Sequence, residues 1–362
     1  MTAPLLFVSG EYLPDVGGVG DYTKNLRGAL AGLGWQSGVL SRRQVRRWDA
    51  RSLLALVRSA PPAGIIHIQY QAGAYDLLGD VCLMPTVLRR FRPRTRVVTT
   101  FHDARPPYLF PKAGFLRAAA VRLLARSSHA VVAADARDLA ALSVSPARSY
   151  HVPIGPNVLC APPPGYDRAA FRLALGLEPD TLALVYFGLR NASKGLNLLL
   201  DAVNLVAASR PGVRLILVGG EVGASDPTDR RTAEQLRARL GTDVIQTGWL
   251  PNDQLSAHLL AADIAILPYA DGASPRRGSL LACAEHGLPI VSTKPAAPEV
   301  AEAVLAVPAD PHRLAKAIFH LVETPSEIAH LRTRSQSLAA STAWPRIGQA
   351  HVEVYEHLLT TR

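Results

Sequence analysis

The chain has 362 residues, of which 48% are hydrophobic and 19% are charged. This composition is typical of a soluble globular protein. No apolar run approaches the length of a membrane span, so the sequence argues against a transmembrane protein. The length exceeds what one hydrophobic core usually supports, which predicts two domains.

The formal net charge of +10 is concentrated in the first half of the chain. Residues 1–157 contain 20 Lys and Arg against 9 Asp and Glu, whereas residues 158–362 contain 19 against 20. A basic half suits an anionic or lipid-linked acceptor, or an anionic membrane surface. The alternative is an arginine-rich composition with solvated side chains. No nucleic-acid partner is expected, because no helix-turn-helix, zinc-finger or RRM pattern is present.

The three cysteines, Cys82, Cys160 and Cys283, show neither pairing nor metal-ligand spacing. A disulfide framework and a zinc site are therefore not expected, and a reducing compartment fits. Strand-like residues 5–8 follow the first methionine closely, without a basic segment or a cleavage site typical of secretion. We expect a cytoplasmic protein, with peripheral contact to the inner membrane surface as a further option.

The first half alternates between segments typical of buried strands and segments typical of helices. We expect helices over 22–33 and 115–126, and strands over 5–8, 65–69, 96–101 and 130–134. The helix over 115–126 is amphipathic, with Arg117, Arg122 and Arg126 on its polar side. It is the candidate for a membrane contact.

A glycine-rich loop follows the first expected strand, with Gly17, Gly18 and Gly20 opening a helix. Glycines at this place let backbone N–H groups approach a ligand oxygen closely. A dinucleotide-binding fingerprint is the alternative, but it requires the glycines directly after the strand and an acidic residue about 20 residues later. Neither requirement is met, so no nicotinamide cofactor is expected.

His102 and Asp103 close the strand over 96–101. Polar residues at the carboxyl end of a buried parallel strand face the ligand site of such folds. His102 could donate to a sugar hydroxyl or a phosphate oxygen, with Asp103 orienting it; a structural histidine is the alternative. His67 lies in the middle of its strand, where a structural role is favoured.

Residues 152–165 are rich in proline and glycine and are typical of a linker. After it the alternation begins again. Strands are expected over 182–187, 214–218, 244–247, 263–268 and 290–293, and helices over 196–208, 232–240, 254–261, 279–286, 312–323, 326–339 and 347–359.

Two such alternations predict an α/β protein of two Rossmann-like domains, whose parallel sheets face each other across a cleft. We expect an acceptor domain over 1–157, a donor domain over 158–340 and a terminal helix within 341–362 that packs back on the first domain.

Cationic residues stand at two turns of the second half. Arg190 and Lys194 follow its first strand, and Arg276 and Arg277 precede Gly278 and Ser279 at the start of a short helix. A helix N-terminus offers unpaired N–H groups, and arginine and lysine side chains bind phosphate oxygens. The two turns together predict a site for a diphosphate.

These segments, in order, resemble glycosyltransferase family 4, whose members are retaining enzymes of GT-B fold. The resemblance extends over nearly the whole chain. It rests on the glycine loop at 17–22, on His102, on the segments 153–157, 194–195, 217–220, 248–251 and 262–268, and on Trp344. It implies a nucleotide-sugar donor and no cofactor.

The resemblance implies functional roles for individual residues. His102, Lys194, Arg276 and Arg277 would act in catalysis. Asp21, Tyr22 and Asp103 would lie on the acceptor side. The donor would be bound by Gly17, Gly18, Gly20, Arg190, Gly248, Leu250, Gly278, Ser279 and Glu285.

Two positions depart from the family pattern. The family's Glu-x7-Glu pair falls on Ser274 and Ala282, so both carboxylates are absent. In the family, the first carboxylate contacts the donor sugar and the second contacts the ribose. Arg276 and Arg277 would take over diphosphate binding, and Glu285 would reach the ribose from one helical turn further on.

The function expected is transfer of a sugar, typically a hexose, from a nucleotide diphosphate to an acceptor hydroxyl with retention. Cations around the departing diphosphate would stabilise its growing charge. The sequence contains no Asp-x-Asp pair, so no metal is expected. The alternatives are a catalytically silent GT-B scaffold, which the missing carboxylates favour, and a sugar-nucleotide epimerase, which would need carboxylates in the site.

Overall fold

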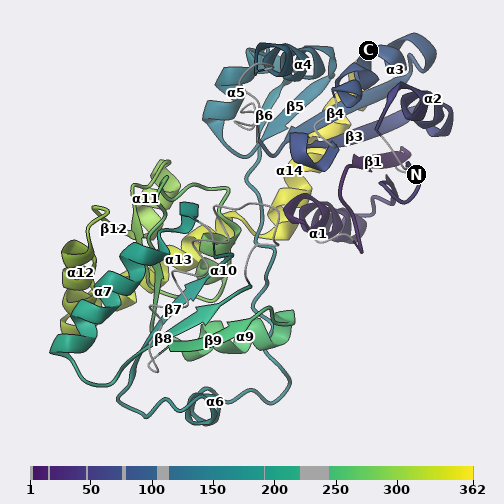
Figure 1. Cartoon of the computed structure of the whole chain (residues 1–362). Coiled ribbons are helices and arrows are strands. Elements are labelled where there is room, and N and C mark those ends of the chain that lie inside the picture. Colours follow the sequence, from purple (N-terminus) through teal and green to yellow (C-terminus); the bar gives the residue numbers. More distant parts are fainter. Residues whose placement is uncertain are drawn as a thin grey trace. The chain divides into compact units, whose positions relative to one another are not determined.

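The computed structural model describes residues 3–14, 17–45, 48–75, 79–103, 114–190, 192–220 and 244–361. The chain forms two compact units, Met1–Asn157 with Ala343–Arg362, and Val158–Thr342 (Figure 1). We call them unit 1 and unit 2. The helix expected over 232–240, the side chain of Arg117, and Arg46, Arg47, Arg105 and Lys112 of the basic half lie outside what is described.

Unit 1 is built on a parallel six-stranded sheet with the strand order β2-β1-β3-β4-β5-β6. All seven residues of β3 are buried, as expected of a strand covered by helices on both faces. The strands are β1 Leu5–Ser9, β2 Ser37–Leu40, β3 Gly64–Tyr70, β4 Thr95–Phe101, β5 Ala130–Ala133 and β6 Ser149–His151.

Alternate residues of these strands enter two separate cores, one on each face of the sheet. Ile65 and Val98 pack with α1 and α14, whereas Ile66 and Val97 pack with α2, α3 and α4. The helices are α1 Gly18–Gly32, α2 Ala50–Ser59, α3 Met84–Phe91, α4 Gly114–Ser127, α5 Ala136–Leu142 and α14 Trp344–Thr360, with the 3-10 turns η1 Ala72–Tyr75, η2 Asp80–Leu83 and η4 Pro146–Arg148.

The last helix, α14, is anchored to unit 1 by buried polar contacts. His67 is hydrogen-bonded through Nδ1 to Tyr355 Oη at 2.6 Å and through Nε2 to Thr100 Oγ1 at 2.7 Å. Trp344 Nε1 donates to the Pro156 carbonyl at 2.9 Å. A Cβ added to Gly155 would lie 2.6 Å from the Trp344 ring, so only glycine fits beneath the indole.

Unit 2 is a second parallel six-stranded sheet, with the order β12-β11-β10-β7-β8-β9. Its strands are β7 Leu182–Phe187, β8 Val213–Val218, β9 Val244–Gly248, β10 Ile264–Leu267, β11 Ile290–Thr293 and β12 Leu305–Val307. Its helices are α6 Arg168–Ala174, α7 Leu196–Ser209, α9 Asn252–Ala261, α10 Gly278–Glu285, α11 Pro298–Ala303, α12 Pro311–Glu323 and α13 Pro325–Ser341, with the 3-10 turn η5 Ala192–Lys194.

The first strand of this sheet, β7, lies between β8 and β10. Later strands are therefore added on both sides of β7, and the strand order reverses there. The carboxyl ends of strands at such a reversal are where α/β sheets bind ligands.

The expected architecture of two parallel α/β sheets is confirmed, and the strands expected over 182–187 and 290–293 have the predicted bounds. The first helix was predicted to begin at Tyr22, and this is wrong: α1 begins at Gly18. Gly18 and Gly20 belong to its first turn, and Gly20 is buried against the backbone of Glu11. No helix among the described residues is both long and apolar enough to span a bilayer.

Three histidines of unit 1, of which His67 and His351 are buried and His102 is half-buried, should make its stability depend on pH. Burial lowers the pKa of His67 well below 6.5, that of His102 to about 3 and that of His351 to about 4. Above pH 6.5 both folded and unfolded chains are neutral at these sites. Below it the unfolded chain binds more protons, so stability falls as pH falls toward 4. We predict that the melting temperature drops by about 5–10 °C between pH 7 and pH 4.5.

Thermal unfolding of His351→Leu and His330→Leu would identify the groups responsible. His351 is buried, and its Nε2 has no partner among the described groups, whereas His330 is exposed. His351→Leu should show a weaker pH dependence than the wild type, and His330→Leu should not. Equal pH dependence in all three would show that the buried imidazole is not the cause.

Candidate active site

The candidate site lies at the carboxyl ends of β7 and β10 in unit 2. A Cβ added to Gly195, which has φ 67°, would lie 1.8 Å from the Pro268 carbonyl oxygen, so the chain before α7 passes directly over the end of β10. The Ala270 N–H donates to the Ser193 carbonyl at 3.0 Å. These two contacts place Lys194 beside Tyr269.

The aromatic ring of Tyr269 lies close to two cationic side chains, those of Lys194 and Arg277. This ring is fully buried, and the Tyr269 hydroxyl is hydrogen-bonded to Ser279 Oγ at 2.7 Å. The guanidinium carbon of Arg277 lies 4.6 Å from the ring centroid, and Lys194 Nζ lies 5.2 Å from it. Cations at these distances are attracted by the face of the ring, so the phenol fixes Lys194 and Arg277 near each other.

The positive charge of this cluster is only partly compensated. Burial, and then the neighbouring Arg277, lower the pKa of Lys194 to about 8, although Asp271 acts in the opposite direction. Arg277 forms an ion pair through Nη2 with Asp271. The Nε of Arg277 is buried without a partner in the part of the chain that the structure describes. Two close cations with spare donors favour binding of a phosphate or diphosphate.

The N-terminus of α10 adds backbone donors to the cluster. Arg277 is the N-cap residue of α10, with no side-chain cap, and Gly278 and Ser279 form its first turn. The first N–H groups of a helix have no intrahelical acceptor, and the helix dipole favours an anion there. Arg276 precedes Arg277 and is half-buried.

Arg190 lies on the β9 side of β7. It is buried, and its Nη1 donates to Gln246 Oε1 at 2.9 Å. Tyr186 lies within electrostatic reach of both Arg190 and Arg277. Arg190 is thus at the same end of the sheet as the cluster, with a neutral partner on β9.

The turn after β9 holds two predicted donor residues, Gly248 and Leu250. Gly248 has φ 65°, and its carbonyl accepts from the Gly219 N–H at 3.1 Å, which joins the ends of β8 and β9. Leu250 is half-buried. Trp249, between them, has 77% of its surface exposed. The sequence analysis did not single out this indole, although an aromatic residue after a strand-end glycine was a signal for it.

The structure does not bring Glu285 to the cluster. Glu285 is the last residue of α10, about 10 Å along the helix axis from Gly278. Its carboxylate accepts a hydrogen bond from the Cys160 backbone, while burial raises its pKa. The helix therefore directs Glu285 to Cys160, within the expected linker 152–165, and its contact with a donor ribose stays a prediction.

In unit 1, the predicted residues of α1 and β4 gather at the carboxyl edge of the sheet. His102 Nε2 is 2.8 Å from Gln69 Oε1, and the His102 ring meets that of Tyr22 edge-on at 4.8 Å. The Gln69 oxygen can only accept, so Nε2 carries the proton of a neutral imidazole. Tyr22 Oη and Gln69 Nε2 are buried without partners among the described residues, which is unusual unless a polar ligand or water satisfies them.

The remaining predicted residues of unit 1 adjoin this group along the chain. Gly17 is the N-cap residue of α1, and Gly18 begins the helix. Asp21 lies in the first turn, and partial burial raises its pKa. Asp103 follows His102 and is half-buried.

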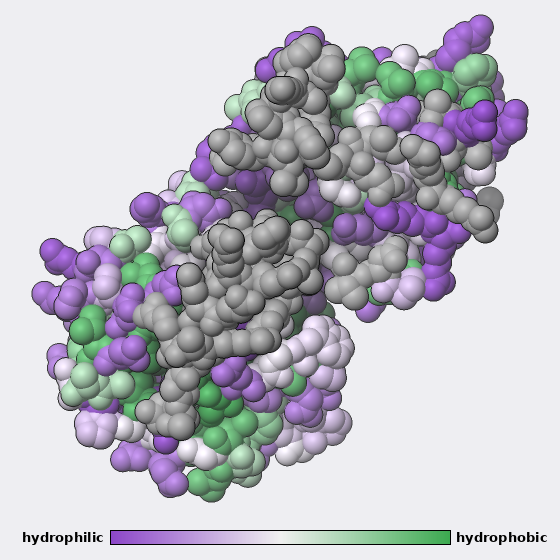
Figure 2. All heavy atoms as spheres, viewed as in Figure 1, coloured by the Kyte–Doolittle hydropathy of each residue, from purple (hydrophilic) through white to green (hydrophobic). Residues whose placement is uncertain are grey.

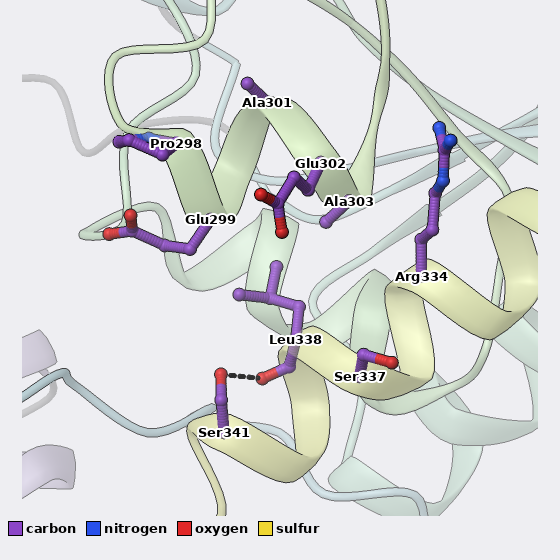
Figure 3. A pocket seen from close by; sticks show the side chains of 9 residues that line it. All are labelled: Pro298, Glu299, Ala301, Glu302, Ala303, Arg334, Ser337, Leu338 and Ser341. Carbon is purple, nitrogen blue, oxygen red and sulfur yellow. Dashed lines mark hydrogen bonds between the residues drawn. The ribbon is translucent and has the colours of Figure 1, made fainter.

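A separate pocket of about 800 Å³ lies between α11 and α13 of unit 2 (Figure 3). Its walls include Glu299, Glu302, Arg334, Ser337 and Ser341. None of the predicted site residues lines it, so it is distinct from the Tyr269 cluster. No group of three His, Cys, Asp or Glu side chains suited to a metal occurs in the described part of the chain.

Part of unit 2 is similar to a known protein family. Residues 181–324 match the family model for glycosyl transferases group 1. D-inositol 3-phosphate glycosyltransferase 2 of Catenulispora acidiphila is 30% identical over 206 residues, which cover 53% of this chain and 47% of that protein. The enzyme of the same name from Geodermatophilus obscurus is 33% identical over 154 residues, 38% of this chain and 34% of that protein. The chain thus spans less than half the length of these curated relatives.

Solved structures resemble the chain over almost its whole length. Sucrose-phosphate synthase of Thermosynechococcus elongatus has a TM-score of 0.73 at 20% identity, covering 99% of this chain and 100% of that one. Anabaena HepE, in complex with UDP and glucose, has a TM-score of 0.72 at 18% identity, covering 98% and 100%. Residues 181–324 are thus similar to group 1 glycosyl transferases, and the chain has the GT-B fold.

The lowered pKa of Lys194 predicts how binding of a diphosphate, with UDP as the probe, would depend on pH. A bound diphosphate favours the protonated amine, so the affinity should fall, by roughly tenfold, as pH rises from 7 to 9.5 through the pKa of about 8. Titration calorimetry in two buffers of different ionisation enthalpy should show proton uptake near pH 8.5. In Lys194→Gln both effects should disappear; a pH dependence unchanged in this variant would exclude Lys194 as their source.

Proposed function

We propose that the chain is a retaining glycosyltransferase that moves a sugar, typically a hexose, from a nucleotide diphosphate to an acceptor hydroxyl without a metal ion. The observation that supports this most strongly is the pair of cations on the Tyr269 ring within residues 181–324. The curated relatives are named as glycosyltransferases. UDP and glucose occupy one of the similar structures.

In the proposed reaction, the bond between the sugar C1 and the diphosphate oxygen breaks, and its electron pair leaves with the diphosphate. Lys194, Arg277 and the N–H groups of α10 would stabilise the charge that develops there. One such interaction contributes about 10²- to 10³-fold in rate. The acceptor oxygen bonds to C1 on the face from which the diphosphate leaves, and its proton passes to the departing phosphate. No protein nucleophile is needed for this route.

We place the acceptor at the carboxyl edge of unit 1, beside His102 and Tyr22. His102 stays neutral throughout the physiological pH range because burial lowers its pKa to about 3. It therefore serves to position a hydroxyl by hydrogen bonding, rather than to attract an anion. The unpartnered Tyr22 Oη and Gln69 Nε2 would bind further polar atoms of the acceptor. Asp21 directly precedes Tyr22 in the sequence, and Asp103 directly follows His102.

The base of the donor would bind at the turn after β9. Gly248 has no side chain to obstruct it, Leu250 offers an apolar contact, and the exposed Trp249 ring offers a stacking surface.

The alternative is a GT-B scaffold that binds a nucleotide without turnover. The residues Ser274 and Ala282, which replace the family's carboxylates, favour it. The two proposals differ in the outcome of an activity measurement.

A thermal-shift screen with UDP, GDP, ADP and dTDP sugars would identify the donor, and its hydrolysis or transfer would then be followed in variants. Arg277→Ala should reduce kcat about 10²-fold or more, because Arg277 is held on Tyr269 at the diphosphate site. Arg276→Ala should also reduce kcat, because Arg276 directly precedes the N-cap residue of α10. Tight nucleotide binding with no turnover of any nucleotide sugar would favour the scaffold.

A second part of the proposal is peripheral contact with an anionic membrane. Arginines gather where β4 and β5 begin, at the opposite end of the sheet from His102. Burial, and then the nearby Arg89, Arg96 and Arg148, lower the pKa of the adjacent His129 to about 4. Phe91, at the end of α3, has 56% of its surface exposed, and Arg90 lies over its ring.

We define this arginine surface as Arg89, Arg90, Arg94 and Arg126, all exposed, with Phe91 among them. Figure 2 shows hydrophilic and hydrophobic residues side by side over the region of α2 and α3. Exposed cations around an aromatic ring suit anionic lipid headgroups. The seven-residue strand β4 separates this surface from the acceptor end by about 23 Å, so it would dock the protein and not bind the acceptor.

Liposome co-sedimentation tests this contact. Replacing Arg89, Arg90 and Arg94 by alanine should weaken binding to vesicles of phosphatidylcholine with 30% phosphatidylglycerol by at least about tenfold, since each arginine contributes on the order of 1 kcal/mol. The matched control replaces the exposed Arg313, Arg332 and Arg334 of unit 2, with the same change in net charge. The proposal would be contradicted if vesicle binding did not depend on salt and anionic lipid content. It would also be contradicted if both variants weakened binding equally.

A further inference from the structure

Asp271 occupies a fixed position at the edge of the Tyr269 cluster. It lies in the tight turn between β10 and α10, where the Gly272 N–H donates to the Tyr269 carbonyl at 3.2 Å. Gly272 has φ 95°, and a Cβ there would lie 2.5 Å from the Lys294 carbonyl oxygen. The Ala273 N–H donates to the Thr293 carbonyl of β11 at 3.0 Å. The turn is thus fastened to the neighbouring strand, and Asp271 is held with it.

The Asp271 carboxylate touches the cations and is also open to solvent. It forms an ion pair with Arg277 Nη2, and it raises the pKa of Lys194 against the other influences there. Its side chain is 61% exposed, whereas that of Arg277 is only 16% exposed. A carboxylate in this position repels a diphosphate, so diphosphate binding alone does not explain it.

A nucleotide sugar has a second group that does suit a carboxylate. The sugar is joined directly to the terminal phosphate, so its hydroxyl groups lie within a few bonds of the diphosphate. A carboxylate has acceptor oxygens only, and it binds hydroxyl donors strongly. A group that contacts the arginine of the diphosphate site from the solvent side is within reach of those hydroxyls.

We infer that Asp271 accepts hydrogen bonds from hydroxyl groups of the transferred sugar, and that Arg277 holds the carboxylate in place while binding the diphosphate. This inference rests on the proposed function and adds a residue that determines donor-sugar specificity. It explains how a sugar is held although Ser274 and Ala282 provide no carboxylate. Glu285 does not compete for this role, since it lies at the far end of α10.

Calorimetric titration of Asp271→Asn with UDP and with UDP-glucose tests the inference. Asparagine keeps the shape of the side chain and removes its charge. The measured quantity is the ratio of the two dissociation constants. A change in the cation cluster affects the binding of both ligands equally, so it cancels in this ratio. We expect the ratio of the UDP-glucose to the UDP constant to rise about tenfold or more, the effect of losing hydrogen bonds to a charged acceptor. Affinity for UDP itself should be unchanged or higher.

Glu302→Gln is the matched control. Glu302 is an exposed carboxylate of the same unit, in the pocket between α11 and α13, and its neutralisation should leave the ratio unchanged (Figure 3). Deoxy analogues of UDP-glucose give a second measurement. The wild type should bind more weakly the analogue that lacks the bound hydroxyl, and Asp271→Asn should no longer distinguish it from UDP-glucose.

The outcomes separate this inference from the proposed function. If the wild type binds UDP and UDP-glucose but Asp271→Asn shifts both constants equally, Asp271 is only a counter-ion of Arg277 and the inference fails alone. A wild type that binds neither ligand would overturn the UDP-sugar site and the inference together.

Discussion

The candidate site depends on two cations held against one buried phenol. Lys194 and Arg277 come from different turns of unit 2, and like charges do not approach each other without compensation. The Tyr269 ring supplies part of it, and the Asp271 carboxylate supplies more. The lowered pKa of Lys194 is the sign that repulsion and burial remain. The negative charge of an anionic ligand would offset both effects, so the cluster is suited to a diphosphate.

Backbone constraints produce this arrangement. Gly195 lies against the Pro268 carbonyl, and Gly272 lies against the Lys294 carbonyl, so the turns after β7 and β10 are both fastened close to the sheet. Ser279 anchors the Tyr269 hydroxyl from the first turn of α10. In unit 1, buried hydrogen bonds to His67 and Trp344 hold α14 and the segment before Asn157 in one body. The neutral His102 adds hydrogen-bonding capacity without charge, so the strongest cationic site described at the strand ends is in unit 2.

Much of the fold followed from the sequence because buried parallel strands are continuous apolar runs, such as β7 and β11. Short edge strands such as β2, with only four half-exposed or exposed residues, lack that signal and were missed. The sequence alone shows cationic residues at the start of expected helices, and this pattern singled out Lys194, Arg276 and Arg277. Tyr269 and Asp271 were not, since their roles arise from contacts between turns that are far apart in sequence. Glu285 was singled out by its sequence distance from Ala282, which does not show that the end of the helix lies at Cys160.

The central claim is that the Tyr269 cluster holds the diphosphate of a nucleotide sugar. A crystal structure of the chain with bound UDP tests it most directly. We predict a phosphate group within hydrogen-bonding distance of both Lys194 Nζ and the Arg277 guanidinium, next to the N-terminus of α10. A structure with UDP bound elsewhere, and with Lys194 and Arg277 in contact with no phosphate oxygen, would contradict the account.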